Sequence, residues 1–173
     1  RFHRGPLPIP PQSPWLRHGV GIFETILWRG GRLAWVDRHL ARAAAGLEAL
    51  GLGALPAELD VLLAEVVRHN QLQEGTARVS LHLGPEREGG PVIPMVMAEP
   101  YLPPPTDPVE ITISDGLHVC SLARFKTSAY LPYREATRRA REMGAWDAAF
   151  LDGEGRLTET GCGALLFADD EGL

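Results

Sequence analysis

Apolar residues in the first third of the chain follow two different periods, and these predict a β-hairpin followed by two helices. Strand-forming residues fill 21–36 on both sides of the Arg-Gly-Gly-Arg sequence at 29–32, which is typical of a tight turn. Leucine and alanine then recur every three or four positions over 37–50, where Asp37 is suited to cap a helix. A second helix is expected to begin at Pro56.

Alternating apolar and polar residues continue the pattern and predict more strands. Residues 77–83 alternate strictly, and a further apolar run occupies 95–98. A proline-rich stretch at 101–108 breaks regular structure before residues 109–113 alternate again. We therefore expect the first hundred residues to form an antiparallel sheet with helices on one face.

The last third of the chain predicts a helix and a second hairpin. The helix is expected from Pro132 and is ended by Gly144. Strands are expected at 148–151 and 156–159, joined by the turn Asp-Gly-Glu-Gly, and a further strand is possible at 164–168.

These elements predict an α+β chain with two domains. We expect a small N-terminal domain over 1–114 and an interdomain linker over 115–124, which lacks clear periodicity. Residues 125–173 would form the first part of a larger C-terminal domain. The chain starts with arginine and stops where a turn leads toward another strand, so we expect this second domain to be incomplete here.

The composition favours a small molecule as the substrate. The net charge of -5 gives no general attraction to nucleic acid or anionic lipid, and no apolar run is long enough to span a membrane. Cys120 and Cys162 lack the spacing of a metal or redox pair, and the histidines show no metal-ligand spacing, so no metal site is predicted. We expect a cytoplasmic protein.

Lys126 is the only lysine, whereas the other sixteen long basic side chains are arginine. Only a primary amine condenses with a carbonyl carbon to form a Schiff base, so Lys126 is the first candidate for covalent chemistry. On composition alone, a surface lysine is the commoner case.

Three ordered segments carry a more specific signal. The first is His-Gly-Val-Gly-Ile-Phe-Glu-Thr at 18–25, followed by His-Leu-Ala-Arg at 39–42. The second is Lys-Thr-Ser-Ala-Tyr-Leu at 126–131, and the third is Asp-Gly-Glu-Gly-Arg-Leu-Thr-Glu at 152–159. Together they resemble the class IV aminotransferase family of pyridoxal-phosphate enzymes, known as fold type IV. Its members include branched-chain and D-amino-acid aminotransferases and 4-amino-4-deoxychorismate lyases.

The resemblance implies a role for each matching residue. Lys126 would bind the aldehyde of pyridoxal 5'-phosphate and then move protons. Arg42 would bind the cofactor phosphate, Glu159 would face the pyridine nitrogen, and Tyr130 would lie beside the phenolic oxygen. Taken alone, Arg42 could be a solvated helix residue, Glu159 an exposed strand-end acid, and Tyr130 a core residue.

The first segment would also supply the substrate pocket, through Phe23 and Thr25, although such residues may simply pair across a sheet. The sequence departs from the family in two places: Ala129 and Ala164 stand where many members have asparagine. The family's second phosphate anchor, a turn that opens a helix, would fall beyond Leu173.

The resemblance implies a homodimer that acts on a small-molecule amine. Phe-Glu-Thr at 23–25 and the four-residue step from Lys126 to Tyr130 are closer to the lyases and D-amino-acid enzymes than to the branched-chain enzymes. We therefore expect an aminodeoxychorismate lyase that forms pyruvate and p-aminobenzoate for folate biosynthesis. The alternatives are an aminotransferase with a D-amino-acid or branched-chain substrate and a non-catalytic relative that binds a ligand.

Overall fold

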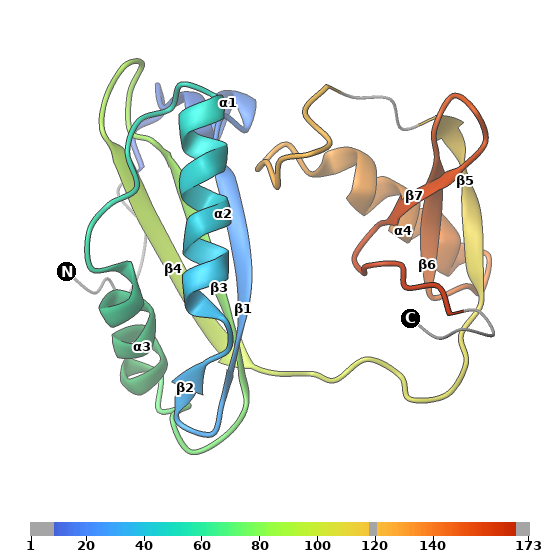
Figure 1. Cartoon of the computed structure of the whole chain (residues 1–173), viewed down its shortest axis with the longest axis horizontal. Coiled ribbons are helices and arrows are strands. Elements are labelled where there is room, and N and C mark those ends of the chain that lie inside the picture. Colours follow the sequence, from blue (N-terminus) through green and yellow to red (C-terminus); the bar gives the residue numbers. More distant parts are fainter. Residues whose placement is uncertain (1–8, 118–120, 169–173) are drawn as a thin grey trace. The chain divides into compact units, whose positions relative to one another are not determined.

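The computed structural model describes residues 9–117 and 121–168, which form two compact units (Figure 1). The first unit contains the described residues up to Pro103 together with Phe125–Ala129. The second contains those from Pro104 to Arg124 and from Tyr130 onward. The chain therefore passes from the second unit back into the first for five residues.

An antiparallel sheet forms the first unit, with strand order β2-β1-β3-β4. Its strands are β1 (Ile22–Arg29), β2 (Arg32–Leu33), β3 (Ala77–Pro85) and β4 (Val92–Pro100). The tight turn between β1 and β2 uses Gly30 and Gly31, both with positive φ. Side chains of β1 alternate between buried and exposed, as predicted for a strand with one covered face.

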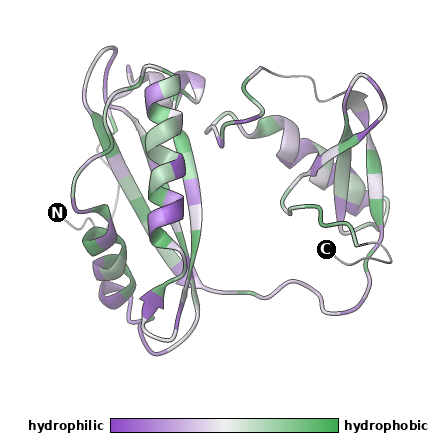
Figure 2. Ribbon diagram, in the orientation of Figure 1, coloured by the Kyte–Doolittle hydropathy of each residue, from purple (hydrophilic) through white to green (hydrophobic). Residues whose placement is uncertain are grey.

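Helices cover that face. They are α2 (Val36–Ala49), which packs on β1, and α3 (Leu59–His69), which packs on β3 and β4. A short helix, α1 (Pro14–His18), also packs on β3. In Figure 2, α2 and α3 carry hydrophobic and hydrophilic residues, which fits helices with one side on a sheet. The core between helices and sheet is aliphatic and includes Ile26, Leu47, Leu63, Val67, Val79, Leu81 and Leu83.

The short helix α1 is held by a close approach to the sheet. The Trp15 ring lies directly on Gly84, where an added Cβ would come within 2.4 Å of the ring. Beside it, the buried Ser13 hydroxyl donates a hydrogen bond to the Pro85 carbonyl at 2.9 Å. These contacts fix the residues that lead into β1.

The second unit contains a three-stranded sheet and one helix. Its elements are β5 (Ile111–Leu117), α4 (Leu131–Glu142), β6 (Asp147–Leu151) and β7 (Leu157–Thr160). The strand order is β5-β6-β7, with β5 and β6 parallel and β6 and β7 antiparallel. A parallel pair needs a crossover, and α4 lies in that connection. Ala136, Ala140, Ala145, Ala148 and Phe150 form the core under the helix.

The division into units differs from the domain boundaries expected from the sequence. Strand β5 includes residues 111–114, which we had assigned to the N-terminal domain, but it pairs with β6 in the second unit. Residues 125–129 belong to the first unit because their backbone bonds to β1. The expected linker over 115–124 contains the end of β5 and residues 118–120, which lie outside the described residues.

Three local expectations were wrong. Asp37 does not cap α2 but lies in its first turn, because the helix begins at Val36 with Trp35 at its N-cap. Residues 164–168 form no strand. Pro56 precedes helix α3 instead of starting it, because Glu58 has a left-handed φ of 56° and the helix begins at Leu59. In the part of the chain that the structure describes, no helix is both long and apolar enough to cross a bilayer.

Candidate active site

Lys126 is fixed by a short backbone ladder beside the start of β1. The Phe23 amide donates to the Lys126 carbonyl at 2.9 Å, and the Ser128 amide donates to the Gly21 carbonyl at 2.8 Å. Ile22 and Thr127 form the antiparallel bridge between these bonds. Residues 126–128 thus extend the sheet of the first unit, and the backbone position of the only lysine is set by β1.

The Lys126 side chain packs on Phe23, an aromatic residue of β1. Its Nζ lies 4.3 Å from the centroid of the Phe23 ring, within the range of a cation–π contact. Phe23 in turn stacks on His82 of β3, with ring centroids 5.6 Å apart. Thr25 shares this face of β1 and is exposed. The half-buried His82 has its pKa lowered by desolvation, which favours the neutral imidazole.

Arg42 is held by a buried carboxylate on the opposite face of β1. Its Nε donates to Glu24 Oε1 at 2.6 Å and its Nη2 to Glu24 Oε2 at 2.5 Å, which is a two-pronged pair. His39 Nδ1 lies 2.7 Å from Glu24 Oε2. The Glu24 side chain is 1% exposed, whereas that of Arg42 is 58% exposed. Hydrogen bonding to Glu24 raises the pKa of Arg42.

Two consecutive residues of β1 therefore hold two of the predicted site residues. Phe23 contacts Lys126, and Glu24 binds Arg42 on the helix side. The structure thus brings Phe23, Lys126 and Arg42 to one short stretch of the first unit.

Tyr130 and Glu159 lie in the second unit, where a stack of aromatic rings connects them. Tyr130 stacks on Tyr133 with centroids 4.5 Å apart, and Tyr133 meets Phe150 edge to face at 5.3 Å. The Tyr133 hydroxyl donates to Glu159 Oε1 at 3.0 Å. The Tyr130 hydroxyl donates to the Gly161 carbonyl at 2.8 Å, and burial raises its pKa, so the phenol is neutral.

The loop after β7 is fixed by the buried carboxylate of Asp147. One oxygen accepts from the Thr137 hydroxyl at 2.7 Å, while the other accepts from the Cys162 amide at 2.9 Å and its thiol at 3.1 Å. Burial and the nearby carboxylate raise the pKa of Cys162 to about 11, so its sulfur is a protonated thiol. Cys162 thus behaves as a loop residue and not as a nucleophile.

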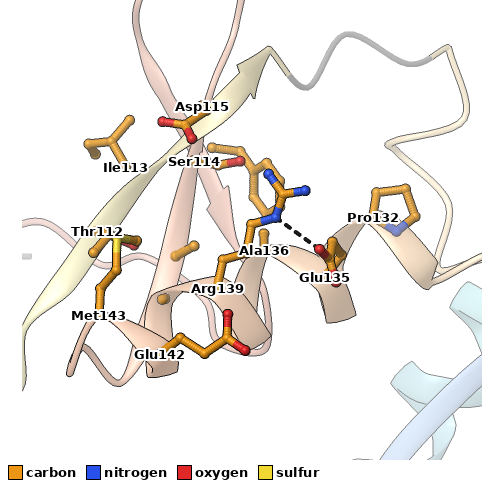
Figure 3. A pocket seen from close by; sticks show the side chains of 13 residues that line it. Thr112, Ile113, Ser114, Asp115, Pro132, Glu135, Ala136, Arg139, Glu142 and Met143 are labelled. Atoms are coloured by element: carbon orange, nitrogen blue, oxygen red, sulfur yellow. Dashed lines mark hydrogen bonds and ion pairs between the residues drawn. The ribbon is translucent and has the colours of Figure 1, made fainter.

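A separate open pocket of about 620 Å³ lies between β5 and α4 in the second unit (Figure 3). Arg139 and Glu135 form an ion pair at its wall, with Nε 2.8 Å from Oε1. None of the residues predicted for the site lines this pocket.

Sequence reasoning missed the partners that hold the candidate residues. The patterns in the sequence gave no binding role to His39, Asp147 or Tyr133. A signal was present for Glu24: it is the one charged residue at an inward position of β1, between Ile22 and Ile26. On the helix, His39 and Arg42 are three residues apart and share a face.

Comparisons with known proteins identify the family of this chain. The sequence model of the amino-transferase class IV family matches residues 21–173. None of the curated protein sequences is significantly similar to the chain.

Solved structures share the fold. A protein provisionally assigned as a 4-amino-4-deoxychorismate lyase is 29% identical, with a TM-score of 0.76 over 90% of this chain and 63% of its own. A hypothetical aminotransferase from Mycobacterium tuberculosis, in its PLP-bound form, is 24% identical, with a TM-score of 0.76 over 92% of this chain and 62% of its own. The branched-chain aminotransferase of Thermoproteus uzoniensis is 23% identical, with a TM-score of 0.78 over 88% of this chain and 57% of its own.

The chain therefore spans less than two thirds of the length of these relatives. The family match nevertheless covers most of its residues, and Phe23, Lys126 and Glu159 all lie inside the match. This chain belongs to the class IV aminotransferase family.

Proposed function

We propose that the protein is a lyase that converts 4-amino-4-deoxychorismate to p-aminobenzoate and pyruvate, with pyridoxal 5'-phosphate, the cofactor of its family. The observation that carries the proposal is the placement of the only lysine. Lys126 is half-buried, its backbone is bonded to β1, and its amine lies against Phe23 of the predicted substrate pocket. A surface lysine retained by chance would need none of these constraints.

The donor chemistry of Arg42 fits the cofactor phosphate. Glu24 occupies the Nε and Nη2 atoms, so the guanidinium is held in one orientation. The side chain is more than half exposed, and Nη1 has no hydrogen-bond partner among the residues described. A held guanidinium with donors remaining is suited to an anionic phosphate.

In this reaction, residues of the chain would bind the cofactor and transfer protons. When bound, the cofactor supplies an aldehyde that takes up the substrate amine and a ring that accepts electrons. Lys126 would hold the cofactor through its amine, would release it when the substrate amine arrives, and would then take the proton from the amine-bearing carbon. The ring C–O bond to the enolpyruvyl group would break, the departing enolpyruvate would take up a proton to become pyruvate, and the substrate ring would become aromatic. Glu159 would keep the pyridine nitrogen protonated.

The choice of a lyase rests on the Phe-Glu-Thr sequence at 23–25, on the spacing from Lys126 to Tyr130, and on the 29% identical relative assigned to that activity. An aminotransferase is the second candidate, because the same fold occurs in the branched-chain enzyme of Thermoproteus uzoniensis. An aminotransferase needs a 2-oxo acid acceptor, whereas the lyase does not.

The test is to incubate the purified protein with pyridoxal phosphate and 4-amino-4-deoxychorismate without any 2-oxo acid. We expect pyruvate and p-aminobenzoate in equal amounts, measured by a lactate dehydrogenase assay and by fluorescence. Lys126→Arg should abolish both products, and borohydride reduction followed by peptide mass spectrometry should find a pyridoxyl group on Lys126 only in the unsubstituted protein. Arg68→Gln, at an exposed position of α3, is the matched control and should retain activity.

The outcomes separate the candidates. A pyridoxyl group on Lys126 without pyruvate would refute the lyase, and amino-group transfer to 2-oxoglutarate would then identify an aminotransferase. Absence of the pyridoxyl group would refute both enzymes and favour the non-catalytic relative.

A further inference from the structure

Tyr133 occupies a position that connects three parts of the second unit. It lies in the first turn of α4, stacks on Tyr130 on one side, and meets Phe150 of β6 edge to face. Its ring is thereby fixed by aromatic contacts at 4.5 and 5.3 Å between centroids. Such pairs restrict a ring more than aliphatic contacts do, because their attraction depends on orientation.

The fixed ring directs its hydroxyl at Glu159. Tyr133 donates to Glu159 Oε1 at 3.0 Å, and Glu159 lies directly across from Phe150 in the register of β6 and β7. A phenol that donates to a carboxylate makes a charge-assisted bond, which is stronger than a bond between neutral groups. Tyr133 and Phe150 therefore contact the predicted cofactor ligand from a helix and from the neighbouring strand.

A second contact joins α4 to β6 and to the residues that follow β7. Thr137, one turn after Tyr133 on the same face, binds Asp147, which in turn binds the Cys162 amide. Gly161 lies in this contact: a Cβ there would come within 2.1 Å of Thr137 Oγ1 and 3.2 Å of the Tyr133 carbonyl oxygen. The helix and the segment that follows Glu159 are thus held at a fixed separation.

We propose that Tyr133 is a positioning residue that holds the Glu159 carboxylate in the orientation with which it binds the ring nitrogen of the cofactor. The inference rests on the role given to Glu159 in the proposed function. It adds that Glu159 binds the cofactor more tightly when its rotamer is set by the hydroxyl of Tyr133. A glutamate has three side-chain torsions to restrict before its oxygens are oriented toward a ligand, and a fixed donor reduces that entropy cost on binding.

A double-mutant cycle on the affinity for pyridoxal phosphate tests this inference. The variants are Tyr133→Phe, Glu159→Ala and the double variant, and the dissociation constant is measured by titrating the apoprotein with pyridoxal phosphate and following protein fluorescence. Tyr133→Phe keeps the aromatic ring, so the stack survives. Tyr101→Phe, on a tyrosine of the first unit, is the matched control.

We expect Tyr133→Phe to weaken cofactor binding roughly threefold to tenfold, which is the range for loss of one hydrogen bond. The same substitution should have less than about a twofold effect in the Glu159→Ala background, because its partner is then absent. Tyr101→Phe should stay within about twofold of the unsubstituted protein.

A purely structural role of Tyr133 would give the same factor in both backgrounds, and that result, or no effect in either, would overturn the inference. The cycle also distinguishes this failure from that of the proposed function. If Glu159→Ala binds the cofactor as well as the unsubstituted protein does, Glu159 is not the ligand of the ring nitrogen. The role given to Glu159 in the proposed function is then refuted, and the inference about Tyr133 is refuted with it.

Discussion

Removal of the Arg42 guanidinium should destabilise the first unit far more than removal of an exposed arginine. Arg42→Met keeps the aliphatic stem but deletes two of the three polar contacts to Glu24. Glu24 Oε1 then has no remaining partner among the residues that the structure describes, and its side chain is only 1% exposed.

The size of the effect follows from this burial. Removing one partner of a fully buried ion pair costs about 3–5 kcal/mol. Here His39 remains, and water can enter where the exposed part of Arg42 had been, so we expect a loss of about 2–3 kcal/mol of unfolding free energy. Arg78 pairs with Glu99 on the surface, with both side chains more than half exposed, so Arg78→Met should cost less than about 1 kcal/mol.

Urea unfolding of the apoprotein, followed by tryptophan fluorescence, is the assay. Trp15 and Trp28 are buried in the first unit and report on it. A double variant, Glu24→Leu with Arg42→Met, should recover part of the loss because no unpaired charge stays buried. If Arg42→Met and Arg78→Met lower the unfolding free energy equally, the assignment of Glu24 as a buried, Arg42-dependent carboxylate is refuted.

Two further predictions concern the loop after β7. Because the pKa of Cys162 is raised to about 11, its thiolate is scarce at pH 8 and iodoacetamide should label it more slowly than a cysteine in the unfolded chain. Asp147→Asn removes the charge that raises this pKa and should speed labelling, measured at Cys162 by peptide mass spectrometry; an unchanged rate would contradict the stated cause. Gly161→Ala should lower the unfolding free energy of the second unit by about 2–4 kcal/mol, because its Cβ would lie 2.1 Å from Thr137 Oγ1. Gly153→Ala, with open space around its Cβ, is the control, and equal thermal midpoints for the two variants would refute the steric argument.

The local elements of this fold were predictable because each depends on a periodic pattern. Strands β1 and β3 alternate buried and exposed residues, and α2 presents apolar residues every three or four positions. The partner of β5 was not predictable in this way. Its pairing with β6 joins residues on either side of the whole of α4, and an alternating pattern does not specify which strand lies alongside.

The candidate site shows the same limit. Motif resemblance indicated Lys126, Arg42 and Glu159, but it did not indicate that Glu24 or Tyr133 orients the last two. These partners are ordinary residue types whose role depends on burial and distance, which the sequence does not state. The absence of a strand at 164–168 could not be predicted either. An apolar run forms a strand only if the edge of another strand accepts its backbone hydrogen bonds.

The backbone ladder at Lys126 has a consequence for the order of assembly during synthesis. The bridge between Ile22 and Thr127 joins residues separated by about a hundred positions, so it is among the most non-local contacts of the first unit. A nascent chain can form the hairpin and pack α2 early, but the margin of β1 near Phe23 stays uncovered until residue 129 has left the ribosome. Residues 125–129, which include the only lysine, therefore join the sheet of the first unit after its other strands have been synthesised.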